Sequence, residues 1–222
     1  MPSFHPPEEM LMAYAAGSMS EPQALLIATH LALCPVCRAR VSELEVLGGT
    51  MMEELEPAAV GDASLQSLLA RLDEAPPQPE SLAPQLAGEV GSIDLSVPQP
   101  LRGYLSAGLT ELPWRTVIPG MAEVDVETAT PEARARLMQV KAGKTMPRHS
   151  HHGEELTLVL TGAYRDASGR YARGDVQVAD PEVDHQPVAE AGEPCICLVV
   201  SDAPVKLTGK ISRLLNPFVS YK

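Results

Sequence analysis

The segment His30-Leu-Ala-Leu-Cys34-Pro-Val-Cys37 places one imidazole and two thiols within eight residues. Apart from His5, no other histidine or cysteine occurs before residue 149. A structural zinc site uses four nitrogen or sulfur ligands in a tetrahedron, and His5, His30, Cys34 and Cys37 supply that number with none left over. The sequence therefore predicts that these four residues bind Zn²⁺ and that the ion folds the N-terminal part of the chain.

The residues around this segment predict two helices that meet at Cys34. The run 20–33 is apolar on most faces, and Ser20 with Gln23 three residues later is typical of a helix N-terminus. Pro35 disfavours helical geometry at the residue before it, so the chain should bend there and a new helix should begin. The thiols would then lie in the first turn of that helix, where the helix dipole stabilises the thiolate form that binds metal.

Other apolar residues at helical spacing predict helices over 7–16 and 35–47, the second ending at Gly48-Gly49. A further helix is expected over 64–72, where four leucines form one apolar stripe. That stripe suits packing on the zinc bundle and also suits a groove for a partner protein.

A Cys-x-x-Cys pair also occurs as a redox pair or as two buried small residues. A thioredoxin-like pair should follow a strand in a βαβ unit, and no strand pattern surrounds Cys34 and Cys37. The zinc interpretation is therefore preferred, with redox and packing roles as the alternatives.

The composition changes twice along the 222 residues and divides the chain into three parts. Residues 1–75 are helical in pattern, and residues 76–103 are rich in proline, which is typical of an extended linker. Residues 104–222 hold short β-branched and apolar runs separated by glycines, which predict an all-β sandwich or barrel. The expected strands lie at 114–118, 135–140, 156–160, 176–178 and 196–200.

A second set of candidate metal ligands lies in this β-rich part, in the pattern Gly143-x5-His149-x-His151-x3-Glu155-x6-Gly162. The pattern matches the first cupin motif at every named position and spacing. His149 and His151 share one face of a strand because side chains alternate with period two. Glu155 is expected to reach the same ion from the neighbouring strand.

The second cupin motif places a histidine eleven residues after a glycine, and Gly174 and His185 meet that spacing. Its expected Pro, Gly and Asn are replaced by Asp180, Glu182 and Ala189. The departure puts the turn there in doubt, although it keeps the ligand spacing. We therefore expect a cupin, a jelly-roll β-barrel, with four ligands to zinc, manganese, iron or nickel: His149, His151, Glu155 and His185. The alternative is a metal-free cupin with hydrogen-bonded histidines.

Cys195 and Cys197 fall on one face of a predicted strand near the end of this domain. They either line the barrel near the metal and take part in oxidant sensing, or they are buried and inert. His152 is not required by the motif and is interpreted as a surface group or as a support of the ligands.

The segment Met12-Ala-Tyr-Ala-Ala-Gly17, followed by His30-x3-Cys34-x2-Cys37, resembles the zinc-binding anti-sigma factors. With the cupin motif behind it, the chain is most similar to the ChrR-type proteins, and the resemblance covers nearly all of it except the linker. The resemblance implies a helical domain (1–75) that binds an extracytoplasmic-function (ECF) sigma factor and masks its polymerase-binding surfaces. It also implies a cupin-like sensor domain (104–222) that promotes release on an oxidative signal such as singlet oxygen. Such a protein regulates transcription in a stress response and is not an enzyme.

Two other functions compete with this one. A metal-dependent cupin enzyme, a dioxygenase or isomerase, would keep an open coordination position for substrate, and the N-terminal zinc domain would then be regulatory. Direct DNA binding is disfavoured, because residues 1–75 hold three Arg, no Lys and eleven acidic residues, a balance of −8 out of −12 for the chain. The same charge would steer the domain towards a basic protein surface.

No apolar run approaches the 18 residues of a membrane-spanning helix, and the first residues lack the pattern of a secretory signal. Four cysteines in two close pairs fit a reducing compartment better than a disulfide scaffold. We therefore expect a cytoplasmic protein with no membrane contact.

Overall fold

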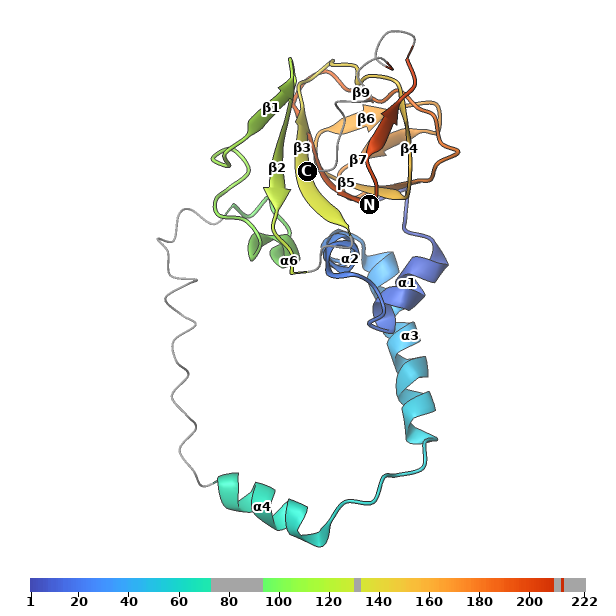
Figure 1. Ribbon diagram of the computed structural model, residues 1–222, viewed down its shortest axis with the longest axis vertical. Helices are drawn as coiled ribbons and strands as arrows, with labels where there is room; N and C mark the ends of the chain where they lie inside the picture. Colours follow the sequence, from blue (N-terminus) through green and yellow to red (C-terminus); the bar gives the residue numbers. More distant parts are fainter. Residues whose placement is uncertain (73–93, 130–132, 210–212, 214–222) are drawn as a thin grey trace.

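The computed structural model describes residues 1–72, 94–129, 133–209 and 213 (Figure 1). The described part before residue 73 is helical, and a β-structure follows residue 114, so the predicted order of a helical region and then an all-β domain is confirmed. The helices are α1 (Glu8–Ala15), α2 (Glu21–Leu33), α3 (Pro35–Glu53), α4 (Asp62–Leu72) and α6 (Gln99–Arg102).

The bend between α2 and α3 lies at Cys34, as the sequence predicts. Cys34 has extended backbone angles (φ −117°, ψ 102°) and is both the last cap of α2 and the first cap of α3. Ser20 likewise caps α2 with extended angles, but its hydroxyl donates to the Gln23 side chain (2.9 Å) instead of accepting from the backbone. The proline after Cys34 therefore places the two thiols at a helix junction.

The prediction that the third helix ends at Gly48-Gly49 is wrong. Helix α3 continues through both glycines to Glu53. Neither glycine has a positive φ, and a Cβ at either position would meet nothing within 4 Å. Two glycines cost a helix about 2 kcal/mol relative to alanine, which lowers its intrinsic stability without forcing a stop.

The β-domain consists of one large sheet and two small ones. The large sheet has six strands in the order β1-β2-β3-β10-β5-β8, and the small sheets have the orders β11-β4 and β7-β6-β9. All of the strand pairs are antiparallel. The large sheet contains β1 (Arg115–Ile118), β2 (Met121–Val126), β3 (Arg134–Val140), β5 (Glu155–Thr161), β8 (Val176–Ala179) and β10 (Cys195–Ser201). The small sheets contain β4 (His149–His151), β6 (Ala163–Arg165), β7 (Arg170–Ala172), β9 (Val188–Ala189) and β11 (Val205–Leu207).

All five apolar runs that the sequence indicated are strands, as β1, β3, β5, β8 and β10, and the two histidines of the first motif form β4. Strands β2, β6, β7, β9 and β11 were not predicted. Four of these five have two or three residues, too few to show an alternation of apolar and polar side chains.

The expected linker 76–103 lies largely outside the described residues, but its last part is packed on the helices. Val97 and Leu101 are almost fully buried, and α6, which carries Leu101, packs on α2. Residues 99–102 are therefore helical rather than extended.

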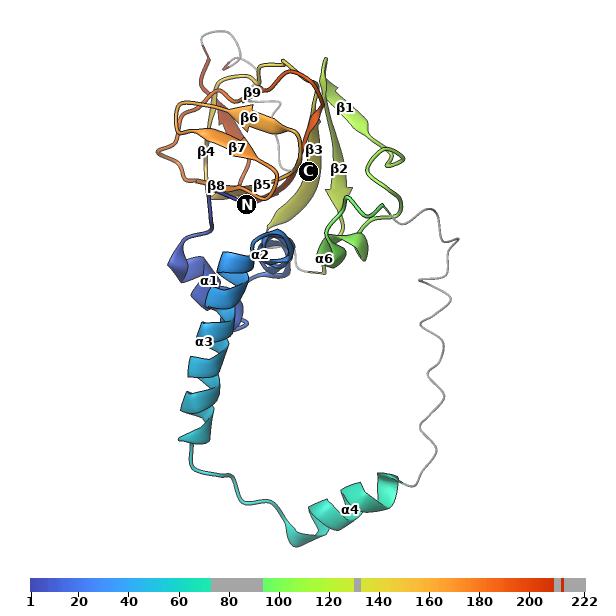
Figure 2. The ribbon, with the colours of Figure 1, turned by 180° about the vertical axis from the view of Figure 1, so that it is seen from behind.

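The two parts of the chain share one hydrophobic core. Helix α2 lies against strands β5 and β10 of the large sheet (Figures 1 and 2). A single cluster of buried side chains joins Leu26 and Ile27 of α2 with Leu158 and Leu198 of the sheet. A helix that is apolar on most faces needs partners on most faces, and the β-domain supplies one of them.

The second half of α3 and all of α4 project away from this body (Figure 1). Within the described residues no single helix is long and apolar enough to cross a membrane. The pair α2–α3 meets that test only when its two helices, bent by 119° at their junction, are taken together.

Candidate functional site

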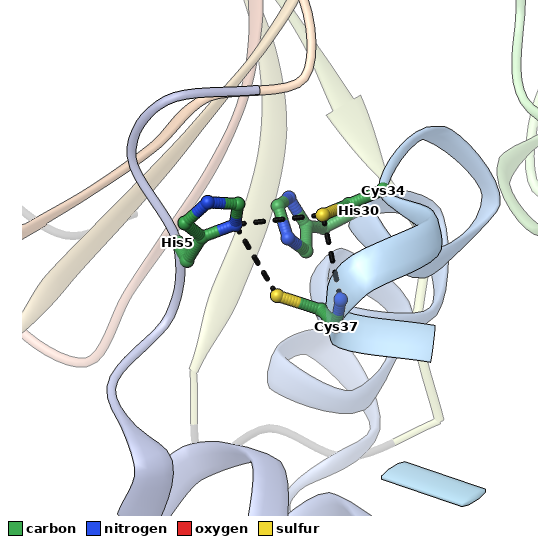
Figure 3. Close-up of side chains that lie close together, drawn as sticks. All are labelled: His5, His30, Cys34 and Cys37. Atoms are coloured by element: carbon green, nitrogen blue, oxygen red, sulfur yellow. Dashed lines mark hydrogen bonds between the residues drawn. The ribbon is translucent and has the colours of Figure 1, made fainter. Parts of the chain in front are cut away.

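The four residues of the predicted zinc site lie together at the junction of α2 and α3 (Figure 3). One possible ligand atom from each lies within 4.8 Å of the other three. His5 Nδ1 is 3.4 Å from Cys34 Sγ and 3.3 Å from Cys37 Sγ. Zinc–sulfur and zinc–nitrogen bonds of ordinary length place the two atoms about 3.5 Å apart in a tetrahedron. The spacing therefore suits one zinc ion.

The imidazole of His30 provides an independent test of that fit. Its Nδ1 lies 2.7 Å from the Gly174 carbonyl oxygen, to which it donates. Its Nε2 is buried and has no hydrogen-bond partner among the described residues. A buried nitrogen lone pair without a partner is costly, and a metal ion would satisfy it. His30 Nε2, His5 Nδ1 and the two thiolates together are a complete donor set for zinc.

Burial opposes the thiolate form of Cys37 in the absence of metal. Burial, and then the hydrogen bond with Cys34, raise the pKa of Cys37 to about 12. For Cys37 the effect of burial is therefore opposite in sign to the stabilisation of thiolate that is expected at a helix N-terminus. Binding of zinc would displace the protons and supply the positive charge that buried thiolates need.

The cupin histidines also meet in space. His149 and His151 lie on β4, and the backbones of His149 and His185 exchange two hydrogen bonds of 2.9 and 3.0 Å. His185 Nε2 is 3.1 Å from His149 Nε2 and 3.4 Å from His151 Nε2. The three Nε2 atoms therefore converge on one point, as three ligands of a single ion require.

Hydrogen bonds select the ring nitrogens that face this point. His149 Nδ1 donates to the Pro147 carbonyl (2.8 Å), and His185 Nδ1 donates to the Asp166 carboxylate (2.7 Å). Each bond fixes the proton on Nδ1 and leaves Nε2 free for a metal, the usual arrangement around metal-bound histidine. Hydrogen bonds from Ser168, Gln177 and His185 outweigh burial and lower the pKa of Asp166 to about 2, so it stays an acceptor.

The turn that carries His185 is held without the proline and glycine of the cupin motif. The Asp180 carboxylate accepts the backbone N–H groups of Glu182 (2.8 Å) and Val183 (3.2 Å). This aspartate turn closes the loop. The degraded motif therefore keeps its ligand in place.

The structure does not bring Glu155 into the same cluster. Its carboxylate lies 3.2 Å from Arg136 and 4.0 Å from His151 Nδ1. Glu155 begins β5, whose neighbours in the sheet are β10 and β8 and not β4. Its role as a fourth ligand stays a prediction. The sequence analysis did not predict the ion pair between Arg136 and Glu155, because the local sequence around a charged residue in a strand does not show which residue will pair with it.

A small cavity of about 40 Å³ adjoins the cupin histidines. His149, His185 and Glu155 line it together with Cys195 and Cys197, whose sulfur atoms are 3.7 Å apart. The two thiols thus line the barrel, as one of their two interpretations requires. The hydrogen bond between them, and then burial, raise the pKa of Cys197 well above its ordinary value, which disfavours thiolate chemistry. His152 is exposed, as a surface group should be.

Because His149 and His151 are buried, we expect the stability of the folded, metal-free protein to depend on pH. Burial lowers the pKa of His151 to about 4 and also lowers that of His149. In the unfolded chain a histidine takes up its proton near pH 6.5. Between these values the unfolded state binds more protons, so the folded state loses stability as the pH falls from about 6.5 to 4.

We expect the metal-free protein to lose about 3 kcal/mol through His151 over that interval, measured by urea unfolding after chelation. A His151→Gln variant should show a flatter dependence. Equal slopes for the two proteins would contradict the assignment.

Both parts of the chain match known protein families. Residues 8–38 match a family described as a putative zinc-finger, and residues 105–204 match the ChrR cupin-like domain. The anti-sigma-E factor ChrR of Cereibacter sphaeroides is 42% identical over 214 residues, which cover 96% of each chain.

A solved structure of Rhodobacter sphaeroides SigE in complex with the anti-sigma ChrR contains a chain that is 40% identical, with a TM-score of 0.78. The match covers 91% of this chain and 100% of that one. Both relatives are regulators, in keeping with the expectation of a non-enzymatic role, and they give the enzyme alternative no support. The similarity extends over 96% of both chains, so the chain belongs to the ChrR family of anti-sigma factors, which join a zinc-finger helical region to a cupin-like domain.

Proposed function

We propose that this protein binds an ECF sigma factor with its N-terminal helices, stapled by zinc, and releases it on an oxidative signal that the cupin domain senses. The observation that carries the binding role is an apolar surface on the second half of α3, the following loop and α4, here called the distal apolar surface. Its members are Val46, Leu47, Met51, Met52, Leu55, Val60, Leu65, Leu68, Leu69 and Leu72.

Each of these ten side chains is between 46% and 74% exposed. Large apolar side chains exposed in such number along one segment of chain mark an interaction site in soluble proteins. Helix α4 has only 11 residues, and every one of its side chains that the structure describes is exposed. A helix that short is marginal in water without a partner. Of the two expectations for the leucine stripe, packing on the zinc bundle is therefore not observed, and a partner-binding role is favoured.

The charge around this surface indicates the kind of partner. Residues 45–72 hold five acidic residues and one arginine. An apolar surface with an acidic surround suits a protein partner with a basic rim and opposes nucleic acid. The relative of 40% identity is in complex with SigE, which supports a sigma factor as that partner.

The sensing role draws on the cupin cavity. Two of the three histidines that would hold a metal ion, His149 and His185, line one cavity together with the two thiols. Metal and sulfur are the groups in a protein that respond most directly to oxidants. Because α2 packs on β5 and β10, a rearrangement of the barrel would move α2 and, through the junction at Cys34, the helix α3 that begins the distal apolar surface.

The binding role is tested by co-expressing the chain with each ECF sigma factor of the same genome and measuring the affinity of the pair that co-purifies. A Leu68→Asp/Leu69→Asp variant should bind at least about 100-fold more weakly, because burying a leucine is worth about 1.5–3 kcal/mol. A Ser67→Asp/Ala70→Asp variant adds the same charge to the opposite face of α4 and should bind like the unmodified protein. The proposal fails if no sigma factor is retained, or if the two variants bind equally well.

A further inference from the structure

Residues 2–5, here called the N-terminal strap, lie on the cupin domain. The backbone N–H groups of Ser3 and Phe4 donate to Asp175 Oδ1 (2.5 and 3.0 Å), and the Phe4 carbonyl accepts the N–H of Val176 (3.1 Å). Val176 begins strand β8. The strap therefore both donates hydrogen bonds to the start of strand β8 and accepts one from it.

Side-chain packing reinforces these bonds. The ring of Phe4 lies on Tyr171, with centroids 4.4 Å apart. Two glycines of the cupin domain leave room for the strap: a Cβ on Gly169 would lie 2.7 Å from Phe4 Cζ, and one on Gly174 would lie 2.8 Å from Pro2 Cγ. Gly174 also has a φ of +90°, which side chains disfavour. The cupin surface is shaped for this segment.

Asp175 is the centre of the anchor. It is only 4% exposed, and its carboxylate accepts three backbone N–H groups: two from the strap on Oδ1, and that of Ala172 (2.8 Å) on Oδ2. A buried carboxylate needs such donors to offset its lost hydration. Removing the strap would leave Oδ1 without these donors.

The strap leads directly into the zinc site. His5 follows Phe4, so the position of its imidazole depends on the docked strap. His30 reaches the same cupin turn, because its Nδ1 donates to the carbonyl of Gly174, the residue before Asp175. Both imidazole ligands are thus oriented by cupin residues 174–176, whereas both thiols come from the α2–α3 junction.

We propose that Asp175 is a positioning residue for the zinc site, so that the cupin domain sets how tightly the N-terminal helices hold their metal. The inference rests on the zinc-binding role proposed above. Partners that orient metal ligands typically contribute about 10–100-fold to metal affinity. The zinc site is then built by both domains, and undocking of the strap weakens it.

The same anchor is connected to the other metal site. The Tyr171 hydroxyl lies 3.0 Å from Ser168 Oγ, which donates to Asp166 Oδ1 (2.6 Å). The other oxygen of Asp166 accepts from His185 Nδ1. Tyr171, which contacts Phe4, and Asp166, which orients His185, therefore belong to one hydrogen-bond network.

The test uses the full-length protein loaded with Co²⁺ in place of zinc. The thiolate-to-cobalt charge-transfer absorption reports on the Cys34–Cys37 site, and a competing chelator then measures affinity. Asp175→Ala should weaken Co²⁺ binding about tenfold or more. Phe4→Ala, which leaves every cupin residue in place, should weaken it in the same direction. Asp94→Ala is the matched control, because that aspartate also accepts two backbone N–H groups, those of Ser96 and Leu109, and neither of them adjoins a candidate metal ligand.

Unchanged affinity in both Asp175→Ala and Phe4→Ala would overturn the inference, as would an equal loss in Asp94→Ala. Sigma-factor capture by the unmodified protein keeps the two proposals apart. If capture fails while the variants still lose metal, the proposed function is wrong and the positioning role stands. If capture succeeds and the variants hold Co²⁺ normally, the positioning role is wrong and the function stands.

Discussion

Replacement of both Cys34 and Cys37 by alanine is expected to abolish sigma-factor binding, with an affinity lower by at least about 100-fold (about 3 kcal/mol). The two thiols lie at the bend between α2 and α3 and meet His5, which precedes α1. Without them no ion fixes the angle of α3, the helix that begins the distal apolar surface. Structural zinc typically contributes about 10–16 kcal/mol of folding free energy in small domains at neutral pH. The junction of α2 and α3 is therefore not expected to keep its geometry without the ion.

The measurement is a titration of the sigma factor together with far-ultraviolet circular dichroism and zinc analysis. The matched control is Cys195→Ala/Cys197→Ala, which removes the same number of buried thiols from β10. That control should keep the N-terminal zinc and native affinity for the sigma factor. A Cys34→Ala/Cys37→Ala protein that still binds the sigma factor like the unmodified chain would show that zinc has no structural role.

Replacement of His149 and His151 by alanine should empty the cupin site and leave the zinc site filled. The variant loses two of the three converging imidazoles. Mutation of a residue that only orients a metal ligand can cost about 100-fold in affinity, so the loss of two ligands should cost more. Metal analysis should show about one equivalent lost per chain. The sigma factor should still bind, because the distal apolar surface is unchanged.

The response to oxidant is the second measurement on this variant. Singlet oxygen from an illuminated photosensitiser should release the sigma factor from the unmodified complex and fail to release it from His149→Ala/His151→Ala. His152→Ala is the control, since His152 is the exposed neighbour of both ligands. If the unmodified protein and both variants release the sigma factor at the same rate, the cupin site does not sense the oxidant.

Local patterns predicted the helices α1 to α4 and six of the strands, and they missed α6 and the strands β2, β6, β7, β9 and β11. Pro35 after Cys34 predicted the bend, and the apolar run before it predicted α2 with the bounds that the structure has. These features depend on residues within four positions of each other. The error at Gly48-Gly49 arose because a glycine in the sequence was interpreted as a helix end. A glycine that ends a helix usually adopts a positive φ, and neither of these two glycines does so.

Ligand spacing also predicted which histidines meet. His149 and His151 are two residues apart on a strand, and His185 joins them through a backbone pair with His149. Glu155 was harder to place. Its nearest charged partner, Arg136, lies on β3, 19 residues earlier in the chain, and no local pattern encodes such a pair.

The sequence by itself determined the order of a helical and a β-rich part, the bend at Cys34, and, apart from Glu155, the two groups of residues that meet as candidate metal sites. Each depends on short-range geometry: the restriction before proline, the period of a helix or strand, and the number of nitrogen and sulfur donors. Only the tertiary structure decided that the parts share a core through α2 and that Asp175 holds the strap beside His5. Those contacts join residues far apart in the chain, and they depend on shape and on the burial of a charge, which no periodicity in the sequence reveals.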